Sequence, residues 1–113
     1  MTIKVIYPSE KANDKRYAYK LTKARSKAIK ELNDGDTVRV LGYCEYEDVN
    51  AKGETHNILC IMDENGNTFS TISATFRNSF DDIANIMDGE DFAITIVKGT
   101  SKAGRDFVDC ELA

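Results

Sequence analysis

The stretch of sequence that decides the fold runs from Ile58 to Val97 and reads ILCIMDENGNTFSTISATFRNSFDDIANIMDGEDFAITIV. It opens with Ile58–Met62, which is apolar on both faces and therefore predicts a central strand. The turn residues DENG follow at positions 63–66, and Asn67–Ser73 then returns as the second strand of a hairpin.

The period of the pattern changes after this hairpin. Apolar residues now recur at i, i+4, i+7 and i+11, which predicts one stripe of a helix formed by Phe76, Phe80, Ile83 and Met87. Asp88-Gly89 supplies a stop signal for that helix. Phe92–Val97 is a further strand, so the segment predicts two strands, a helix and a strand.

Toward the C-terminus, a basic turn with two glycines, KGTSKAGRDF at positions 98–107, leads into a last strand over Arg105–Leu112. Toward the N-terminus, Thr37–Asp48 alternates over a long stretch. Strict alternation predicts two faces of this strand: Val38, Val40, Cys44 and Tyr46 on one, and Arg39, Leu41, Tyr43 and Glu45 on the other. Gly42 predicts a bulge or bend within it.

The first forty residues are basic, although the chain as a whole carries a net charge of −4. They contain ten Lys and Arg against five Asp and Glu, whereas the rest contains five against fourteen. The block from Lys15 to Lys30 has seven cations and no acid. We expect Ile3–Tyr7 to be extended, and Lys11–Lys30 to be an irregular arm with one or two helical turns near Ser26–Leu32. Such a local stripe attracts polyanions whatever the net charge.

The resulting order is β-β-β-α-β-β after a basic arm, in one domain of 113 residues. This is the order of a five-stranded OB-fold barrel with one helix between strands 3 and 4. We expect a mainly β protein with an N-terminal extension over residues 1–33 and the barrel over residues 34–113. An α+β sandwich with an open sheet is the alternative for the same order.

Several classes of function are disfavoured. His56 is the single histidine and stands in a polar loop, so we expect a solvent-exposed residue rather than a catalytic base. The three cysteines are spaced as buried apolar residues rather than as a disulfide framework or zinc site. The Gly99 to Arg105 turn lacks the Lys-Ser/Thr ending of a phosphate-binding loop and leads into a strand rather than a helix. We expect no enzyme activity. No apolar run approaches the length of a membrane span and no secretory signal is present, so we expect a cytoplasmic protein.

What remains is a set of cations interleaved with aromatic residues, which suits unpaired nucleic acid. Bases stack on aromatic rings, and Lys and Arg neutralise phosphates. The candidate contacts are Tyr17, Tyr19, Lys20, Lys23, Arg25, Lys27, Arg39, Tyr43, Phe69, Lys98, Lys102, Arg105 and Phe107. Parity does not settle whether Tyr43 and Phe69 face a ligand or pack against the helix.

The chain resembles the OB-fold single-stranded DNA-binding proteins of bacteriophages, especially those that infect Gram-positive hosts. The resemblance lies in YKLTK at 19–23, LNDGD at 32–36, DENGNTFSTIS at 63–73 and GTSKAGRDF at 99–107. It implies a non-catalytic protein, without a metal or nucleotide cofactor, that coats single-stranded DNA in phage replication or recombination within the host cell.

Two alternatives stay open at this point. One is an OB-fold interaction module whose acidic surface from Leu41 onward binds a replisome or host-defence protein. The other is RNA binding, which the 2′-hydroxyl distinguishes from DNA binding. The partners that we expect are single-stranded DNA, phage replication or recombination proteins, and further copies of the chain. The final residues DCELA at 109–113 are part of a strand rather than a long acidic tail for partner recruitment.

Overall fold

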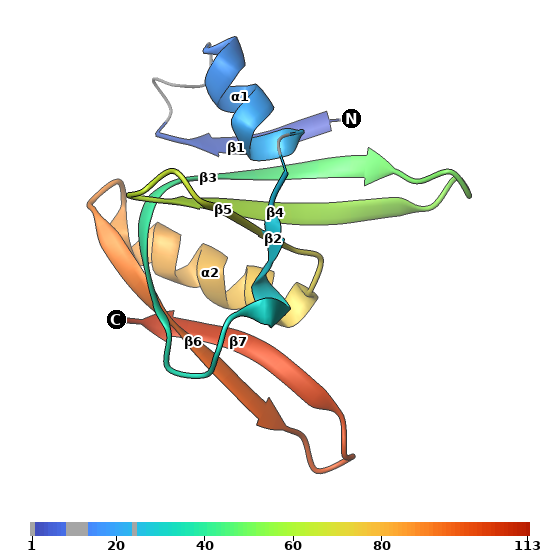
Figure 1. Cartoon of the computed structure of the whole chain (residues 1–113), viewed down its shortest axis with the longest axis vertical. Helices are drawn as coiled ribbons and strands as arrows, with labels where there is room; N and C mark the ends of the chain where they lie inside the picture. The colour runs from blue at the N-terminus through green and yellow to red at the C-terminus, as the bar shows by residue number, and fades with distance from the viewer. Residues whose placement is uncertain (1, 9–13, 24) are drawn as a thin grey trace.

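The structure is a computed structural model and describes residues 2–8, 14–23 and 25–113. Over these residues the chain forms one curled, half-barrel sheet of seven strands with two α-helices (Figure 1). In chain order, the elements are β1 (Thr2–Tyr7), α1 (Lys15–Thr22), β2 (Lys27–Ala28), the 3₁₀ turn η2 (Ile29–Glu31), β3 (Thr37–Val49), β4 (Thr55–Asp63), β5 (Thr68–Thr71), α2 (Ala74–Met87), β6 (Phe92–Thr100) and β7 (Asp106–Leu112).

The sheet runs in the order β2-β5-β4-β3-β6-β7, and β1 pairs with β3. Strand β3 belongs to both halves of the sheet, because Thr37–Val40 pairs with β6 and Val40–Val49 pairs with β4. This sharing curls the sheet. Within the described part of the chain, no ladder joins β5 to β7, so the half-barrel stays open between them.

Gly42 marks a β-bulge in β3. The register against β4 shifts between Val40 and Gly42, which leaves Leu41 unmatched. Because side chains alternate along a strand, one extra residue exchanges the faces beyond it. Tyr43 therefore lies on the same face as Val40. The prediction that Tyr43 shares a face with Arg39 is wrong for this reason, although the bulge itself was predicted.

Two hydrophobic clusters lie on the two faces of the β3–β4 pair. We call the face toward α2 the inner face; its cluster is made by Ile29, Val38, Val40, Leu59, Ile61, Phe76, Phe80, Ile83, Phe92, Ile94, Ile96 and Cys110. The outer face lies under α1 and holds Leu21, Cys44, Tyr46, Cys60 and Met62. Cys44 and Tyr46 were predicted on the face of Val38 and Val40, and the bulge places them on the other. Burial on both faces explains why Ile58–Met62 is apolar throughout.

The N-terminal segment differs most from expectation. Residues 11–13 and 24 of the expected irregular arm lie outside the described residues, but Lys15–Thr22 is an α-helix and Thr2–Tyr7 is a strand of the sheet. The turn η2 lies within the range where we expected helical turns. The sheet has seven strands rather than five over the described residues. No helix among those residues combines the length and apolarity needed to cross a membrane.

Candidate functional site

Helix α1 rests on the outer face of the sheet. The Asp14 carboxylate caps its first turn by accepting from two backbone N–H groups at 3.0 and 3.3 Å. Leu21 is 1% exposed, and the half-buried Tyr17 donates its hydroxyl to the Tyr7 carbonyl at 2.9 Å. A Cβ on Gly42 would collide with that hydroxyl oxygen, so the bare glycine lets the ring reach the strand. Tyr17, a predicted DNA contact, is thus placed where it supports the helix.

The other predicted residues of α1 face solvent. Tyr19 is 61% exposed, and Lys20 and Lys23 are exposed as well. Lys20 Nζ lies 3.8 Å from the position that a Cβ of Gly66 would take, which places this ammonium over the β4–β5 turn. Lys20 of α1 therefore lies near the start of β5.

A row of paired residues crosses the inner face from β3 to β2. Tyr43 pairs with Ile61, Ile61 with Phe69, and Phe69 with Lys27. Paired neighbours project to the same face of a sheet. Lys27 and Phe69 lie at the end of this row that is farther from α2, and Tyr43 lies at the covered end.

Tyr43 is packed under α2. Its ring stacks on Tyr7 with the centroids 5.2 Å apart and meets the ring of Phe80 edge-on at 4.9 Å. Burial, followed by the charges of Asp81 and Glu45, raises the pKa of Tyr43. The sequence left open whether this ring faces a ligand or packs against the helix. In the structure it packs against the helix.

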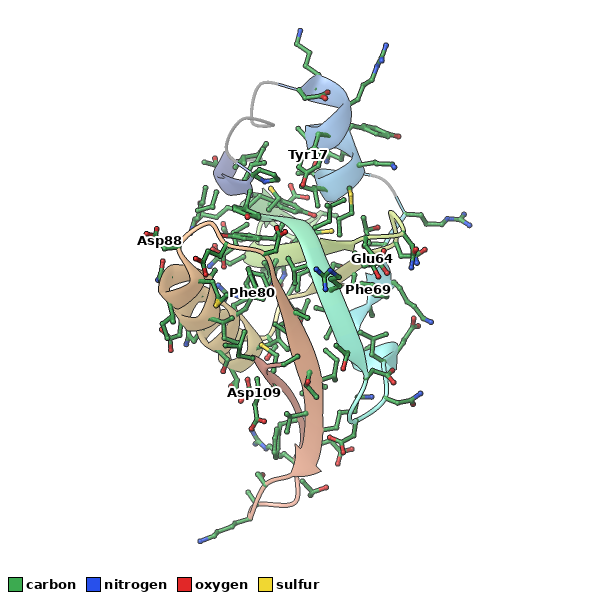
Figure 2. The ribbon with its side chains drawn as sticks, turned by 90° about the vertical axis from the view of Figure 1, so that its left-hand side faces the viewer. Tyr17, Glu64, Phe69, Phe80, Asp88 and Asp109 are labelled. Atoms are coloured by element: carbon green, nitrogen blue, oxygen red, sulfur yellow. The ribbon has the colours of Figure 1, made fainter. Side chains whose placement is uncertain are left out.

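Phe69 is half-buried: it packs against the inner cluster and borders two shallow hollows. One, of about 400 Å³, includes Arg25 and Lys27, and the other, of about 430 Å³, includes Arg39 and Glu64. Figure 2 shows Phe69 beside Glu64, on the side of the molecule away from Phe80. We call this region, made by Arg25, Lys27, Arg39 and Phe69, the Phe69 surface.

Acids lie on the Arg39 side of the Phe69 surface, because Asp36, Asp63 and Glu64 line the same hollow. Arg39 Nε lies 3.6 Å from Glu64 Oε2, and both side chains are more than half exposed. An exposed ion pair of this kind contributes about 0–1 kcal/mol, so this pair separates at little cost.

The hairpin between β6 and β7 carries the remaining predicted residues. Lys102 and Arg105 are exposed at its tip, which is closed by hydrogen bonds between Ser101 and Arg105. Lys98 lies lower, where its Nζ donates to the carbonyl of Lys30. Phe107 is 40% exposed.

Phe107 and Lys98 line an open groove of about 880 Å³ between the hairpin and the end of β5. The groove is also lined by residues that were not among the predicted contacts: Lys30, the hydroxyl residues Thr71, Ser73 and Thr75, and the exposed Ile72. The basic block signalled Lys30, but no local pattern shows that it meets the hairpin.

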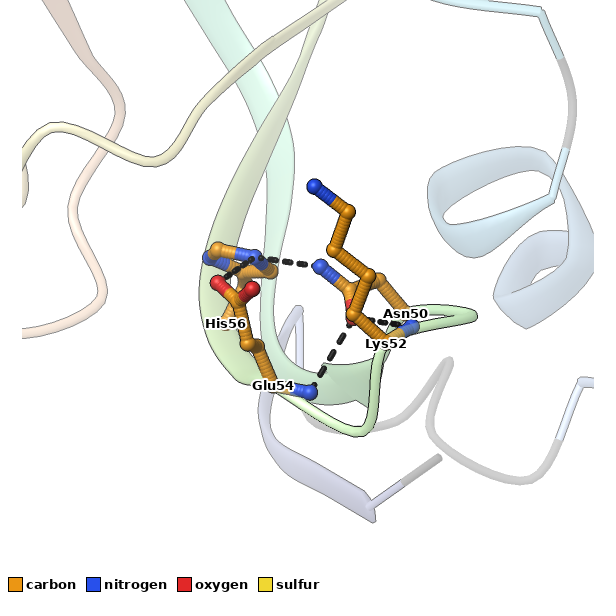
Figure 3. A network of polar contacts seen from close by, with 4 residues as sticks. All are labelled: Asn50, Lys52, Glu54 and His56. Carbon is orange, nitrogen blue, oxygen red and sulfur yellow. Dashed lines mark hydrogen bonds and ion pairs between the residues drawn. The ribbon is translucent and has the colours of Figure 1, made fainter.

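The loop between β3 and β4 is fixed by its own polar contacts (Figure 3). The Asn50 side-chain oxygen accepts from the backbone N–H groups of Lys52 and Glu54 at 2.9 and 3.0 Å, and its Nδ2 lies 3.2 Å from His56 Nε2. His56 is half-buried and part of β4, whereas we expected an exposed loop residue. Its contacts are structural ones.

Apart from Tyr17 and Tyr43, which pack against the two hydrophobic clusters, the predicted residues lie in the Phe69 surface, in the hairpin with its groove, and on the exposed side of α1. Comparison with curated proteins and with solved structures finds no match for this chain. A family model described as phage single-stranded DNA-binding protein matches residues 3–113. That match spans the N-terminal elements as well as the half-barrel and confirms the family that the sequence resembles. The chain belongs to the family of phage single-stranded DNA-binding proteins.

Proposed function

We propose that this protein binds single-stranded DNA without sequence preference and coats and protects it during phage replication or recombination in the host-cell cytoplasm. It acts as a binding protein and not as an enzyme. Its membership of a single-stranded DNA-binding family supports DNA as the ligand. The partners in this proposal are single-stranded DNA and phage replication or recombination proteins.

We also propose that the half-barrel is an OB-fold. Strands β3, β4, β5, β6 and β7 take the places of its five strands, and α2 lies between the third and fourth. Strand β1, helix α1 and strand β2 are then additions that cover the outer face and the edge of β5. On this assignment the β3–β4 loop and the β6–β7 hairpin flank the binding surface.

The Phe69 surface is the observation that carries the proposal. Lys27 is the lateral partner of Phe69 in the sheet, so a cation and an aromatic ring lie side by side at its edge. A ring binds the flat face of an unpaired base, and neighbouring cations bind the phosphates on either side of that base. Arg25 lies with Lys27 in the hollow on one side of Phe69, and Arg39 lies in the other hollow together with the acids Asp36, Asp63 and Glu64.

The test is titration of a fluorescein-labelled dT30 oligonucleotide, followed by anisotropy at several salt concentrations. We expect binding that weakens with salt, and quenching of tyrosine fluorescence. Replacing Arg25 and Lys27 together by Ala should weaken binding and reduce the slope of log K against log[salt] by about 0.7 for each phosphate that is no longer neutralised. Lys4→Ala is the matched control. Lys4 is an exposed lysine of β1, and its Nζ lies 2.9 Å from Glu47 Oε1 in an ion pair.

A second variant addresses the hairpin. Replacing Lys98, Lys102 and Arg105 together by Ala should also weaken binding and flatten the salt dependence. An unchanged slope removes the hairpin cations from the interface. No binding of dT30 by the wild-type protein at low salt rejects the proposal as a whole, and tighter binding of rU30 than of dT30 makes RNA the ligand.

A further inference from the structure

The open side of the half-barrel forms a groove with two different walls. One wall is the end of β5 and the start of α2, with η2 beside them; the other is the β6–β7 hairpin, and Figure 1 shows this hairpin projecting away from the rest of the sheet. The groove holds about 880 Å³, which lies within the range of small-molecule sites. It lies where no ladder between β5 and β7 closes the described part of the sheet.

Phe107 lies against the wall formed by the hairpin. It pairs with Gly99 across the strands, and a Cβ at Gly99 would stand 2.8 Å from Phe107 Cζ and 3.0 Å from Cε1. The ring therefore covers the bare backbone of Gly99. Because that side of the ring is occupied, the 40% of Phe107 that is exposed belongs to its other side and its rim.

Polar groups surround this ring in the groove. Lys98 Nζ donates to the Lys30 carbonyl, so two lysines are held near each other on the side toward η2. Thr71 and Ser73 bring hydroxyl groups from the opposite wall. The acid in the groove, Asp106, accepts a hydrogen bond from the Thr100 hydroxyl at 3.1 Å.

This arrangement suits a flat ligand with an anionic end. The supported aromatic ring offers a stacking surface, the hydroxyl groups offer hydrogen bonds to the rim of a base, and the lysines offer charge to a phosphate. A free phosphate would gain nothing from Phe107 and would meet Asp106. An unpaired nucleotide uses all three kinds of group.

We propose that this groove is a stacking subsite for one unpaired nucleotide of a bound DNA single strand, with the base on Phe107 and the phosphate toward Lys30 and Lys98. This rests on the proposed function and adds a base-binding position that is separate from the Phe69 surface. The strand then crosses the open side of the half-barrel between β5 and β7.

The test compares dT30 with an oligonucleotide of the same length made of abasic units. Phe107→Ala should weaken dT30 binding roughly 5- to 100-fold, because stacking on one aromatic ring contributes about that much. It should leave binding of the abasic strand unchanged, since the phosphates are the same. Phe107→Tyr keeps the ring and should bind dT30 within about twofold of wild type.

Gly99→Ala gives an independent variant that leaves Phe107 in the chain. The added methyl group displaces the ring, so dT30 binding should weaken in the wild-type background. It should weaken no further when position 107 is already Ala, because no ring is left to displace. Leu112→Ala, at an exposed apolar residue of the same strand, is the control and should bind as wild type.

The outcomes separate this proposal from the general one. Wild-type binding of dT30 together with unchanged binding by folded Phe107→Ala overturns the subsite and leaves the proposed function standing. Equal losses on dT30 and on the abasic strand also overturn it, because they indicate phosphate contact without stacking. Circular dichroism establishes that each variant is folded.

Discussion

Each face of the β3–β4 pair holds one helix, but the two helices are held in different ways. On the inner face, α2 inserts Phe76 and Phe80, which are both 0% exposed. On the outer face, α1 has one buried residue, Leu21. Its attachment to the sheet depends on hydrogen bonds from hydroxyl groups as well. Tyr17 and Tyr46 donate to backbone carbonyls there at 2.9 and 3.2 Å.

The difference follows from what each kind of contact contributes. A buried aromatic side chain contributes several kcal/mol, whereas a hydrogen bond contributes about 0.5–1.5 kcal/mol net. We therefore expect α2 to open only with the whole domain and α1 to open at a lower free energy. The helix that carries the exposed cations Lys20 and Lys23 is the less firmly attached one, and variants on each face measure how large the difference is.

The largest effect is expected from Phe80→Ala on the inner face. Phe80 contacts the rings of Tyr43 and Phe92 at centroid distances of 4.9 and 5.8 Å, so its removal leaves a cavity beneath α2. The free energy of unfolding should fall by about 3–5 kcal/mol in urea titration. Ile86→Ala on the same helix, where the residue is 78% exposed, should change it by less than about 0.5 kcal/mol. A fall of less than about 1 kcal/mol for Phe80→Ala would contradict the strong inner attachment.

Gly42→Ala tests the outer face. Its methyl group would collide with the Tyr17 hydroxyl and would stand 2.7 Å from the Tyr7 carbonyl oxygen. Such overpacking costs about 1–3 kcal/mol, and here we expect the effect as faster amide hydrogen exchange in α1 with α2 still protected. Leu41→Ala, at the neighbouring half-exposed position, is the control and should leave α1 protected. Equal deprotection of both helices would mean that the two faces unfold as one unit.

The sequence predicted the inner face well and the outer face poorly, for physical reasons. The helix stripe from Phe76 to Met87 repeats over three turns, so its period is clear, and α2 spans Ala74–Met87. Helix α1 has eight residues and one buried apolar side chain, too few to show a period. It is stabilised by Asp14 and by contacts with β3 and β4, which are distant in sequence.

The candidate site, too, was predicted where the signal is local and was not predicted where it depends on residues distant in sequence. Local signals predicted the cations and the basic turn, and the bulge at Gly42. The direction of Tyr43 depends on how one unmatched residue exchanges the faces of β3, which requires the register with β4. The meeting of Lys30 with Lys98 joins residues 68 positions apart, and no local pattern encodes it.

A smaller effect is expected from Tyr46→Phe, again on the outer face. The change removes the hydrogen bond to the Thr22 carbonyl at 3.2 Å and keeps the shape of the ring. We expect α1 to be destabilised by about 0.5–1.5 kcal/mol, measured by hydrogen exchange. Tyr43→Phe on the inner face is the matched control, because the described residues include no hydrogen bond from its hydroxyl, and it should not affect α1. Reduced hydrogen-exchange protection in α2 rather than in α1 would contradict the assignment of the Tyr46 hydroxyl to the outer face.

A further effect is a dependence on pH that belongs to the inner face. The side chains of Glu45 and Asp81 share a hydrogen bond, and burial, followed by the charge of Asp81, raises the pKa of Glu45 to about 7 against the opposing charges of Arg77 and Lys4. A carboxyl with a raised pKa binds its proton more tightly in the folded state. Stability is therefore highest below the unfolded pKa and falls as pH rises through about 7.

Glu45→Gln removes this titration, so the fall in stability between about pH 5 and pH 8 should become shallower than in wild type. Glu111→Gln, at an exposed position of β7, is the control and should keep the wild-type slope. Because Asp81 lies on α2, hydrogen exchange at the alkaline end of this range should show the wild-type destabilisation in α2 and the sheet beneath it. A destabilisation confined to α1 would contradict the assignment, since α1 lies on the opposite side of β3 from the carboxyl pair.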